Sequence, residues 1–529
     1  MGDDSLYNTW VASGRLTAPP PKILASAAVV LWRHRRRDGE LEVYWVRRDP
    51  AMPFMGGWWA FPGGGVAKLD IQAPPGLVAG APRGLSPGQI SGDLPESVQG
   101  PGSLPPDEIP GLVVAAVREL AEEVGLLVTA AGAVRPAEPE FDAARRNLGA
   151  KELSLAGLAE RFGVTLDASP LVFAGRWLTP PFAPVRFDNR FFLLEHPESA
   201  PEPLDSSEAI AAEWVRPADA LERWFSGDVV AAPPILHVLR VLAEDGPEAG
   251  LPRLLAPAEV NLGPFRQVEF RPGVILFPLP TPTLPPATHT NTYLVGFGDC
   301  VLVDPGTPHG PELEALEAAL LEARERLGRR VTAILLTHHH PDHVGGVAPL
   351  AARLGVPVWA HRATAERLAG RFKVDRELTD GEVLELPGAP TMRLEVLFTP
   401  GHARGHLAFW DAERRSLLAG DLLSAVSTIV IDPPEGDMDD YLASLERVAA
   451  LDPLVLFPGH GPTLAQGRVK IEELIRHRLD REGRIRAALA AGKASPQDMV
   501  AEVYDDVPPE VWPLACRQIQ AHLNRLARA

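Results

Sequence analysis

The sequence predicts a multidomain protein built from α/β and α+β units, and three observations predict it. The 529 residues exceed the size at which one hydrophobic core usually serves a whole chain. Short apolar runs with strand character alternate with helical patterns in two separate regions. The stretch 74–110 is rich in Pro, Gly and Ser and shows no period. It therefore predicts an exposed insertion with little regular structure.

The first region begins after a proline-rich lead. The apolar run 23–31 predicts a buried strand, and 42–46 should pair with it across the polar turn 35–39. A helical pattern over 111–125 ends at Gly125, a residue suited to a helix C-terminus. The unit is completed by about residue 250 with strands near 171–178 and 190–194 and a helix near 217–225.

The second region opens with the apolar runs 272–277 and 291–295, and strands again alternate with helices. From about residue 470 the pattern turns helical, and no internal repeat is visible. We therefore expect four segments: an N-terminal tail 1–21, a first domain 22–250, a second domain 251–469 and a C-terminal extension 470–529.

The composition argues against several classes of protein. Charged residues make up 23% and hydrophobic residues 46%, as in ordinary globular proteins. No basic and apolar leader begins the sequence and no apolar run reaches about eighteen residues, which argues against a secreted or membrane-spanning protein. Cys300 and Cys516 both lie in apolar stretches, which predicts two buried reduced thiols and a cytoplasmic setting. The net charge of -18 argues against a broad nucleic-acid surface.

A histidine cluster is the clearest chemical signal. Residues 337–343 read Thr-His-His-His-Pro-Asp-His directly after the apolar run 331–336. Imidazole and carboxylate suit zinc and similar divalent ions. Because each candidate follows a short apolar strand, the candidates could converge at one edge of a sheet. Of fifteen histidines, seven fall in three short motifs: His338, His339, His340 and His343; His402 and His406; and His460.

These motifs resemble the metallo-β-lactamase superfamily, most closely its glyoxalase II and β-lactamase-like protein 2 relatives, over about residues 260–529. The resemblance implies an αββα sandwich holding two Zn²⁺, or Mn²⁺ or Fe²⁺. It assigns one metal to His338, His340 and His402. It assigns the other to Asp342, His343 and His460, with Asp421 as the bridging carboxylate.

The same resemblance implies roles for other residues. Asp304, in Val301-Leu-Val-Asp-Pro-Gly306, matches an aspartate that supports the site without binding metal. Asp342 is the candidate catalytic carboxylate, and His339 and His406 stay outside the ligand set. Two divalent cations about 3.5 to 4 Å apart can share a bridging hydroxide and clamp an oxyanion, so no protein nucleophile is required.

The substrate of this centre stays open at the sequence level. Glyoxalase II-like proteins split thioesters, whereas β-lactamase-like protein 2 relatives are associated with cleavage of single-stranded RNA. The segment 470–529 resembles the small winged-helix-like extension of the latter group. It carries ten Lys or Arg and nine Asp or Glu, so it is nearly neutral. A packing role and a binding role for it are equally open.

A second signal is a row of carboxylates in the pattern Arg118-Glu-Leu-Ala-Glu-Glu-Val-Gly125. On a helix, Glu119, Glu122 and Glu123 stand at i, i+3 and i+4 and share one face. Like charges placed this way repel unless a cation neutralises them. Mg²⁺ with oxygen ligands does so and also neutralises diphosphate oxygens. From these residues alone, a solvated acidic helix is the alternative.

Together with Phe61-Pro-Gly-Gly64, this helix resembles the Nudix hydrolase family over about residues 22–250, including 177–182 and 186–193. The resemblance implies an α/β/α sandwich that hydrolyses a nucleoside diphosphate linked to another group, using Mg²⁺ or Mn²⁺. By motif, Glu119, Glu122 and Glu123 bind metal, and one of them also acts as base. Arg118 orients these carboxylates, and the supporting positions are Gly63, Gly64 and Asp70.

Two departures from that family bear on the substrate. About forty extra residues separate Gly64 from the helix, as in the coenzyme A diphosphatase branch, and Asp70 stands where the motif expects Glu. Arg48 and Gly57 fit the arginine-bearing signature of that branch, while Pro53 stands where a second arginine is expected.

The sequence therefore predicts a bifunctional metal-dependent hydrolase acting on a phosphorylated or thioester small molecule. An acyl-coenzyme A offers a thioester to one centre and a diphosphate to the other. The first alternative is an RNA-processing enzyme with dimetal endoribonuclease activity. The second treats the Nudix unit as a weak or inactive binding or regulatory module.

Overall fold

The computed structural model describes residues 23–52, 55–85, 108–180, 183, 185–203, 208–256, 261–263 and 265–528. The chain divides into two compact units between Val260 and Asn261, and each is described separately. The predicted tail 1–21, residues 86–107 of the predicted insertion, Pro53 and Phe182 lie outside the described residues. The finer domain boundaries stay predictions.

The first unit is built on a seven-stranded mixed sheet. Its main path runs β11-β2-β1-β10-β9, with β1 and β10 parallel and the other neighbours on this path antiparallel. Outside this main path, the short strand β3 pairs with β2 and the short strand β4 pairs with β1. The bounds are β1 Ile23–His34, β2 Leu41–Arg48, β3 Trp59–Ala60, β4 Gly63–Gly65, β9 Val172–Leu178, β10 Arg186–Glu195 and β11 Ala209–Val215.

Both faces of this sheet are covered, which follows from the side-chain alternation of β1. Ala27, Val29 and Leu31 pack with α4, Ile109–Val124, in one hydrophobic cluster. Ala28, Val30 and Trp32 pack in a second cluster with α7, Pro217–Ser226, and α8, Pro233–Glu244. The unit is thus the predicted α/β/α sandwich, with α4 held against the sheet.

Helix α4 shows how its sequence fixes its ends. It begins at Ile109, so residues 109 and 110, which we predicted as part of the insertion, are helical. Pro110 is compatible with the first turn, where its missing N–H costs no hydrogen bond. Gly125 ends the helix in the left-handed region with φ of 69°, as predicted.

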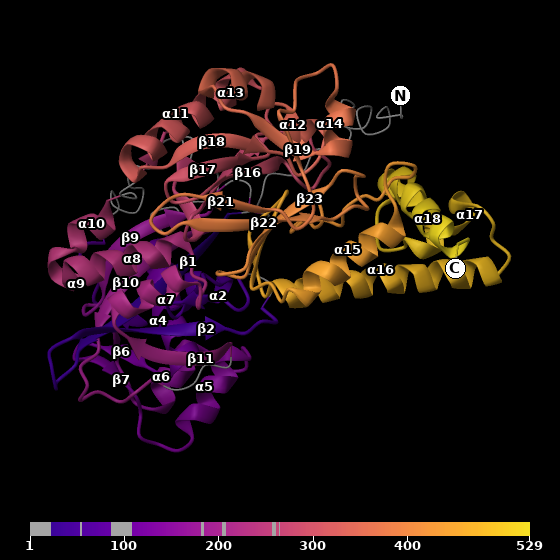
Figure 1. Ribbon diagram of the computed structural model, residues 1–529. Coiled ribbons are helices and arrows are strands. Elements are labelled where there is room, and N and C mark those ends of the chain that lie inside the picture. Colours follow the sequence, from indigo (N-terminus) through magenta and orange to yellow (C-terminus); the bar gives the residue numbers. More distant parts are fainter. Residues whose placement is uncertain are drawn as a thin grey trace. The chain divides into compact units, whose positions relative to one another are not determined.

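The second unit carries two mixed sheets (Figure 1). The first runs in sequence order from β14 to β20, and the second from β21 to β26. Buried contacts between Tyr293 and Phe457 join them face to face. The first-sheet bounds are β14 Val268–Arg271, β15 Val274–Pro280, β16 His289–Val295, β17 Asp299–Val303, β18 Arg330–Leu335, β19 Val358–His361 and β20 Arg376–Leu378. The second-sheet bounds are β21 Val383–Leu386, β22 Met392–Phe398, β23 Leu407–Asp411, β24 Ser416–Gly420, β25 Val455–Pro458 and β26 Leu464–Ala465.

Helices cover the outer faces of the two sheets, giving the predicted αββα sandwich (Figure 1). On one side lie α11 Gly310–Leu327, α13 Val347–Leu354 and α14 Arg362–Leu368. On the other side α15, Met438–Ala450, and the start of α16, Gly467–Ala490, share a hydrophobic cluster with the second sheet. The ligand-bearing loops leave the ends of these strands.

The C-terminal extension is helical and has a small core of its own. It consists of the far part of α16, then α17 Pro496–Val503 and α18 Trp512–Leu526. Ile485, Met499 and Ile519 are among the fully buried members of this core. The extension therefore packs as a separate small layer beyond α15.

Cys300 and Cys516 are both free thiols, but only Cys300 is fully buried. The prediction of burial was wrong for Cys516, because α18 turns that position toward the edge of the small C-terminal core. Among the described residues, no helix is long and apolar enough to cross a membrane.

Candidate functional site

The histidine cluster forms because several strands end at the same edge of the second unit. His338 and His340 follow β18, and Asp342 and His343 lie on α12, Pro341–Val344. The other candidates follow strands of the second sheet. His402 comes after β22, Asp421 directly after β24, and His460 after β25.

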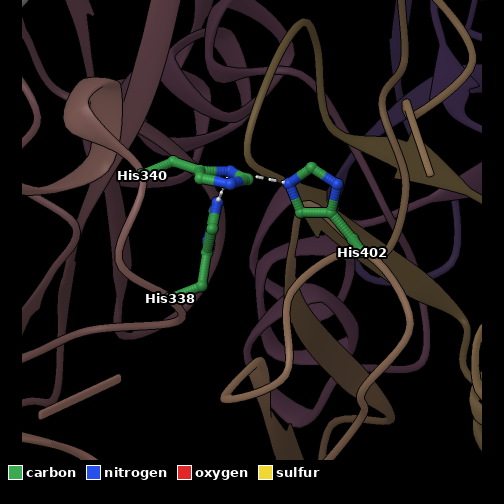
Figure 2. A group of neighbouring side chains, drawn as sticks. All are labelled: His338, His340 and His402. Carbon is green, nitrogen blue, oxygen red and sulfur yellow. Dashed lines mark hydrogen bonds between the residues drawn. The ribbon is translucent and has the colours of Figure 1, made fainter. Parts of the chain in front are cut away.

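The first half of the centre is a set of three converging imidazoles (Figure 2). His340 Nδ1 lies 2.9 Å from His338 Nε2 and 2.9 Å from His402 Nε2. The Nδ1 of His402 faces the Val430 carbonyl oxygen at 2.7 Å, so that nitrogen carries the proton. The Nε2 of His402 therefore carries a lone pair that points toward His340. In this arrangement both imidazoles can bind one cation.

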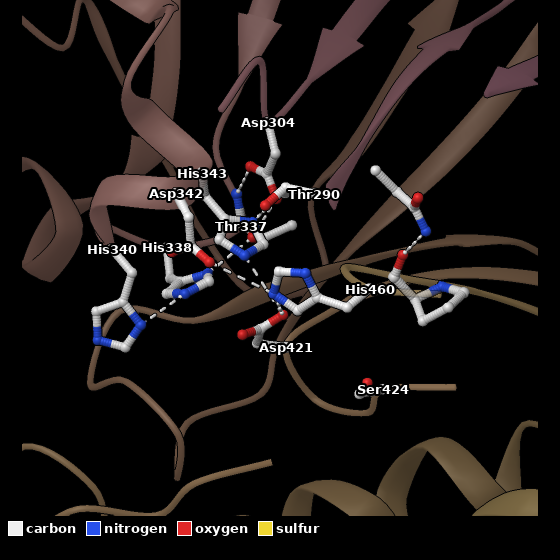
Figure 3. A network of polar contacts seen from close by, with 12 residues as sticks. Thr290, Asp304, Thr337, His338, His340, Asp342, His343, Asp421, Ser424 and His460 are labelled. Carbon is white, nitrogen blue, oxygen red and sulfur yellow. Dashed lines mark hydrogen bonds and ion pairs between the residues drawn. The ribbon is translucent and has the colours of Figure 1, made fainter. Parts of the chain in front are cut away.

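The second half brings together Asp342, His343 and His460 (Figure 3). The His460 Nε2 lies 3.5 Å from an oxygen of Asp342. Its Nδ1 faces the carbonyl oxygen of His289 at 2.9 Å, which fixes the ring so that its Nε2 points inward. The predicted metal-binding groups of this half thus converge in the described structure.

Asp421 lies between the two halves. Its carboxylate oxygens are 3.4 Å from His343 Nε2, 3.4 Å from His460 Nε2 and 3.6 Å from His402 Nε2. Gly459 makes this approach feasible, because a Cβ there would stand 2.3 Å from an Asp421 oxygen. The position fits the bridging role that the sequence predicts.

Asp304 orients one histidine of each half (Figure 3). Its carboxylate accepts from His343 Nδ1 at 2.8 Å, and from the Thr337 hydroxyl at 2.5 Å and amide at 2.8 Å. The Thr337 oxygen then lies 3.0 Å from His338 Nδ1 and accepts a hydrogen bond from it. Although Asp304 stands near His338 and His343, its oxygens are occupied by these donors, which favours support over metal binding.

The donor set fits divalent transition-metal ions. Histidine nitrogens with fixed Nδ1–H partners and two inward carboxylates are the ligands that zinc and similar ions prefer. The buried His343 Nε2 and Asp421 Oδ1 lie 3.4 Å apart without forming a hydrogen bond, and neither has another hydrogen-bond partner among the described residues. Such orphaned buried atoms are expected where a cation binds.

His339 and His406 belong to none of the close ligand groups found among the described residues. His406 is fully buried, and its Nδ1 lies 2.8 Å from the Thr399 hydroxyl. Burial lowers the pKa of His406 to about 3, so this imidazole stays neutral. Leaving it out of the ligand set agrees with this geometry.

The relay through Thr337 leads to a testable difference between two variants. Asp304→Asn should lower the affinity for both predicted metals by about 10- to 100-fold, because it disturbs His343 and, through Thr337, His338. Thr337→Val should lower the affinity only for the metal predicted to bind His338. Titration of each variant with a competing chelator measures both affinities. Equal binding in Asp304→Asn and the unmodified chain would contradict the orienting role.

The carboxylate centre of the first unit is organised around Arg118. Its guanidinium makes paired bonds to Asp70 at 2.8 and 2.9 Å. It also contacts Glu122 at 2.8 Å and Glu119 at 2.9 Å. Arg118 thus touches two of the three predicted ligands, as expected of an orienting residue. Asp70, which stands where the motif expects Glu, is used to hold Arg118.

The glycine-rich strand β4 lies against the same carboxylates. The amide of Gly63 donates to Glu123 at 2.9 Å, and Gly64 pairs with Ala27 of β1. A Cβ on Gly64 would stand 2.4 Å from a Glu119 oxygen. The glycines are therefore needed for the close approach of the helix carboxylates to the sheet.

The electrostatics of this centre favour a bound cation. Burial raises the pKa of Glu119 to about 7, raises the pKa of Glu122, and raises the pKa of Glu123 well above its ordinary value. Arg118 and Arg48 lower the pKa of these carboxylates but do not offset the effect of burial, so a divalent ion with oxygen ligands fits here. These three carboxylates are not gathered into one close group among the described residues, unlike the histidines of the second unit.

Glu208 acts on the carboxylate centre although no sequence motif contains it. Its charge raises the pKa of all three carboxylates, Glu119, Glu122 and Glu123. Its carbonyl accepts from the Asp49 amide at 2.7 Å, just before β11 pairs with β2. Because it lies far along the chain and belongs to no motif, only the pairing of β11 with β2 could have indicated it.

The two neighbouring glycines of β4 provide a matched pair of variants. Gly64→Ala should displace the flexible Glu119 carboxylate and lower Mg²⁺ affinity by about 10-fold or more, with little loss of stability. Gly65→Ala should leave binding intact, since the nearest atom to its new Cβ is 4.0 Å away. Calorimetric Mg²⁺ titration and thermal unfolding test this. Equal affinities in the two variants would contradict the role of Gly64.

Comparison with known family models finds three matches. Residues 21–242 match a NUDT19 Nudix domain, residues 285–460 the metallo-beta-lactamase superfamily, and residues 495–529 a beta-lactamase associated winged helix domain.

Three curated relatives are similar to this chain over most of their own length. A beta-lactamase-like protein 2 homolog of Caenorhabditis elegans is 30% identical over 45% of this chain and 79% of that protein. A hydroxyacylglutathione hydrolase of Methylococcus capsulatus is 35% identical over 39% of this chain and 75% of that protein. An atrochrysone carboxyl ACP thioesterase of Aspergillus fumigatus is 27% identical over 42% of this chain and 70% of that protein.

Proposed function

Because the chain belongs to the metallo-beta-lactamase superfamily and carries a Nudix domain in its N-terminal half, we propose that its two centres hydrolyse different bonds of one substrate class. Acyl-coenzyme A is that class. The second unit would cleave the thioester, and the first would cleave the diphosphate. The observation that carries the proposal is the presence in one chain of a converging His/Asp cluster and of a separate group of buried carboxylates around Arg118.

The thioester assignment rests on the second centre. Two of the relatives are named a hydroxyacylglutathione hydrolase and an ACP thioesterase. We assign His338, His340 and His402 to one metal, Asp342, His343 and His460 to the other, and Asp421 to both. Two Zn²⁺, or Mn²⁺ or Fe²⁺, would supply the Lewis-acid and water-activating chemistry of a binuclear hydrolase.

The residues of this chain set the direction of the ligands and the charge of the centre. Asp304, Val430 and His289 accept hydrogen bonds from the outer N–H groups of His343, His402 and His460, so the inner nitrogens face one point.

Cys300 is not suited to act as a nucleophile, because burial raises the pKa of its thiol to about 12. In the hydrolysis proposed here the attacking group is water rather than Cys300.

The diphosphate assignment rests on the first centre. We assign Glu119, Glu122 and Glu123 to Mg²⁺ or Mn²⁺ and the orienting role to Arg118, with one of the glutamates also acting as base. Binding the ion would relieve the repulsion among these buried carboxylates and also neutralise diphosphate oxygens. The cytoplasmic setting remains a prediction, with which two free thiols agree.

The structure offers little support for the RNA alternative. Several cations of the C-terminal extension are engaged within the second unit. Arg481 binds Asp506, Arg525 binds Glu482 and Arg528 binds Asp437. Such paired arginines leave less positive charge for phosphates. The extension is therefore better explained as a packing element.

A substrate panel tests the proposal. Purified chain is offered acyl-coenzyme A, free coenzyme A, ADP-ribose and single-stranded RNA, and thiol release and diphosphate cleavage are followed independently. We expect thiol release from acyl-coenzyme A and diphosphate cleavage of both coenzyme A compounds. RNA cleavage without thiol release would favour the RNA alternative. Thiol release without cleavage of any diphosphate would favour a binding role for the Nudix unit.

A further inference from the structure

The loop between β24 and α15 links the dimetal centre to the C-terminal extension. It starts at Asp421, directly after β24, and ends at Asp437, the N-cap of α15. Within it, the Val430 carbonyl accepts the Nδ1–H of His402 at 2.7 Å. The direction of one predicted metal ligand thus depends on where this loop holds its backbone.

The neighbouring carbonyl, that of Ile429, is held by the extension. Arg478 of α16 donates to it, and Gln518 of α18 donates to it at 3.1 Å. The Arg478 guanidinium also donates to the Gln518 side-chain oxygen at 3.3 Å. Both side chains are buried, with 2% and 6% of their surface exposed. Two buried donors from different helices therefore meet at one loop oxygen.

Other contacts attach the same loop to the same helices. Arg517 of α18 binds the Asp432 carboxylate and donates to the Pro433 carbonyl at 2.6 Å. The Arg478 guanidinium lies 5.2 Å from the centre of the Tyr441 ring. The Tyr441 hydroxyl donates at 2.9 Å to the carbonyl of Leu422, the residue after Asp421. Arg478 thus contacts two residues that are linked to predicted ligands. Ile429 precedes Val430, which bonds to His402, and Tyr441 bonds to Leu422, the residue after Asp421.

The loop has little regular structure of its own between these points. In the described part of the chain, the Ile429 and Val430 carbonyls accept only from Arg478, Gln518 and His402. Only the two soft dihedral angles of Val430 separate the two carbonyl-bearing peptides. Fixing the Ile429 carbonyl therefore restricts the direction of the Val430 carbonyl, and with it the His402 ring.

We propose that the C-terminal extension is a positioning element of the dimetal centre, acting through Arg478 and Gln518 on the Ile429–Val430 backbone and so on His402. This inference rests on the proposed metal-binding role of His402. Arg478 and Gln518 touch neither substrate nor metal, and their effect is on the geometry of a ligand. Partners that orient ligating histidines typically change metal affinity by 10- to 100-fold when removed.

The full-length chain offers a matched control for this test. Arg478→Met removes the donor to Ile429. Arg481→Met removes a similarly buried arginine one turn along α16, whose partners, Val503 and Asp506, belong to the extension itself. Zn²⁺ affinity is measured by chelator competition. Hydrogen exchange of residues 422–437 reports the loop directly, without reference to activity.

We expect Arg478→Met to weaken one of two bound Zn²⁺ ions by about 10- to 100-fold and to speed exchange in the loop. Arg481→Met should change neither. Gln518→Leu, a milder change, should shift both readouts in the same direction by less, which keeps the test decisive if Arg478→Met fails to fold. Unchanged Zn²⁺ binding in both Arg478→Met and Gln518→Leu, or equal losses in Arg478→Met and Arg481→Met, would overturn the inference. Absence of Zn²⁺ binding in the unmodified chain would instead contradict the proposed dimetal centre.

Discussion

Asp342→Asn should abolish thioester hydrolysis and leave diphosphate cleavage unchanged. The substitution removes a buried carboxylate charge 3.5 Å from His460 Nε2, where we place the second metal. Asparagine keeps the shape but cannot balance a divalent cation to the same extent. We expect a loss of roughly 10³-fold in kcat, the size usual for removal of a charged catalytic group.

Thiol release from acyl-coenzyme A measures this loss, and metal analysis should show fewer than two transition-metal ions per chain. Asp480→Asn is the matched control, because Asp480 is an exposed carboxylate of α16 away from the ligand set. Full thioesterase activity in Asp342→Asn would contradict the assignment of this aspartate.

Glu122→Gln should have the reverse effect, with diphosphate cleavage lost and thiol release retained. The Glu122 carboxylate is partly exposed on α4 and held by Arg118 at 2.8 Å, so it is well placed to share a cation with a substrate diphosphate. Removing its charge should lower diphosphate cleavage by roughly 10²- to 10⁴-fold, the range for loss of a metal ligand that can also act as base.

Release of the nucleotide product measures this effect, and Glu160→Gln, at an exposed site on α6, Leu155–Arg161, is the control. If Glu122→Gln has no effect on a cleavage that the unmodified chain performs, the metal role of Glu122 is wrong. If the unmodified chain cleaves no diphosphate at all, the Nudix unit is better explained as a binding module.

Local patterns predicted much of the fold. The alternation in β1 and the apolar face of α4 produce a sheet covered on both sides, and Gly125 ends the helix where its conformational freedom is needed. The histidine motifs were also local, because each follows a strand whose end fixes the position of the next few residues. The local motifs therefore indicated the candidate ligands, whereas their division into two metal-binding groups came from the resemblance to a known family.

Other parts of the site depend on contacts between distant residues. The Val430 carbonyl and Thr337 hydroxyl orient histidines, yet a backbone oxygen has no sequence signature and a lone threonine is common. Glu208 approaches the carboxylate helix only because β11 pairs with β2. Arg478 lies in a nearly neutral segment and belongs to no motif, whereas the structure buries it against the loop next to the predicted metal ligands.

The central claim is that one chain carries two independent hydrolytic centres for one substrate class. Mass spectrometry of the products of a single acyl-coenzyme A, incubated with the unmodified chain, Asp342→Asn or Glu122→Gln, tests it most directly. The unmodified chain should release both free thiol and adenosine bisphosphate, Asp342→Asn only adenosine bisphosphate, and Glu122→Gln only free thiol. Loss of both products in either variant, or no cleavage of acyl-coenzyme A by the unmodified chain, would contradict the claim.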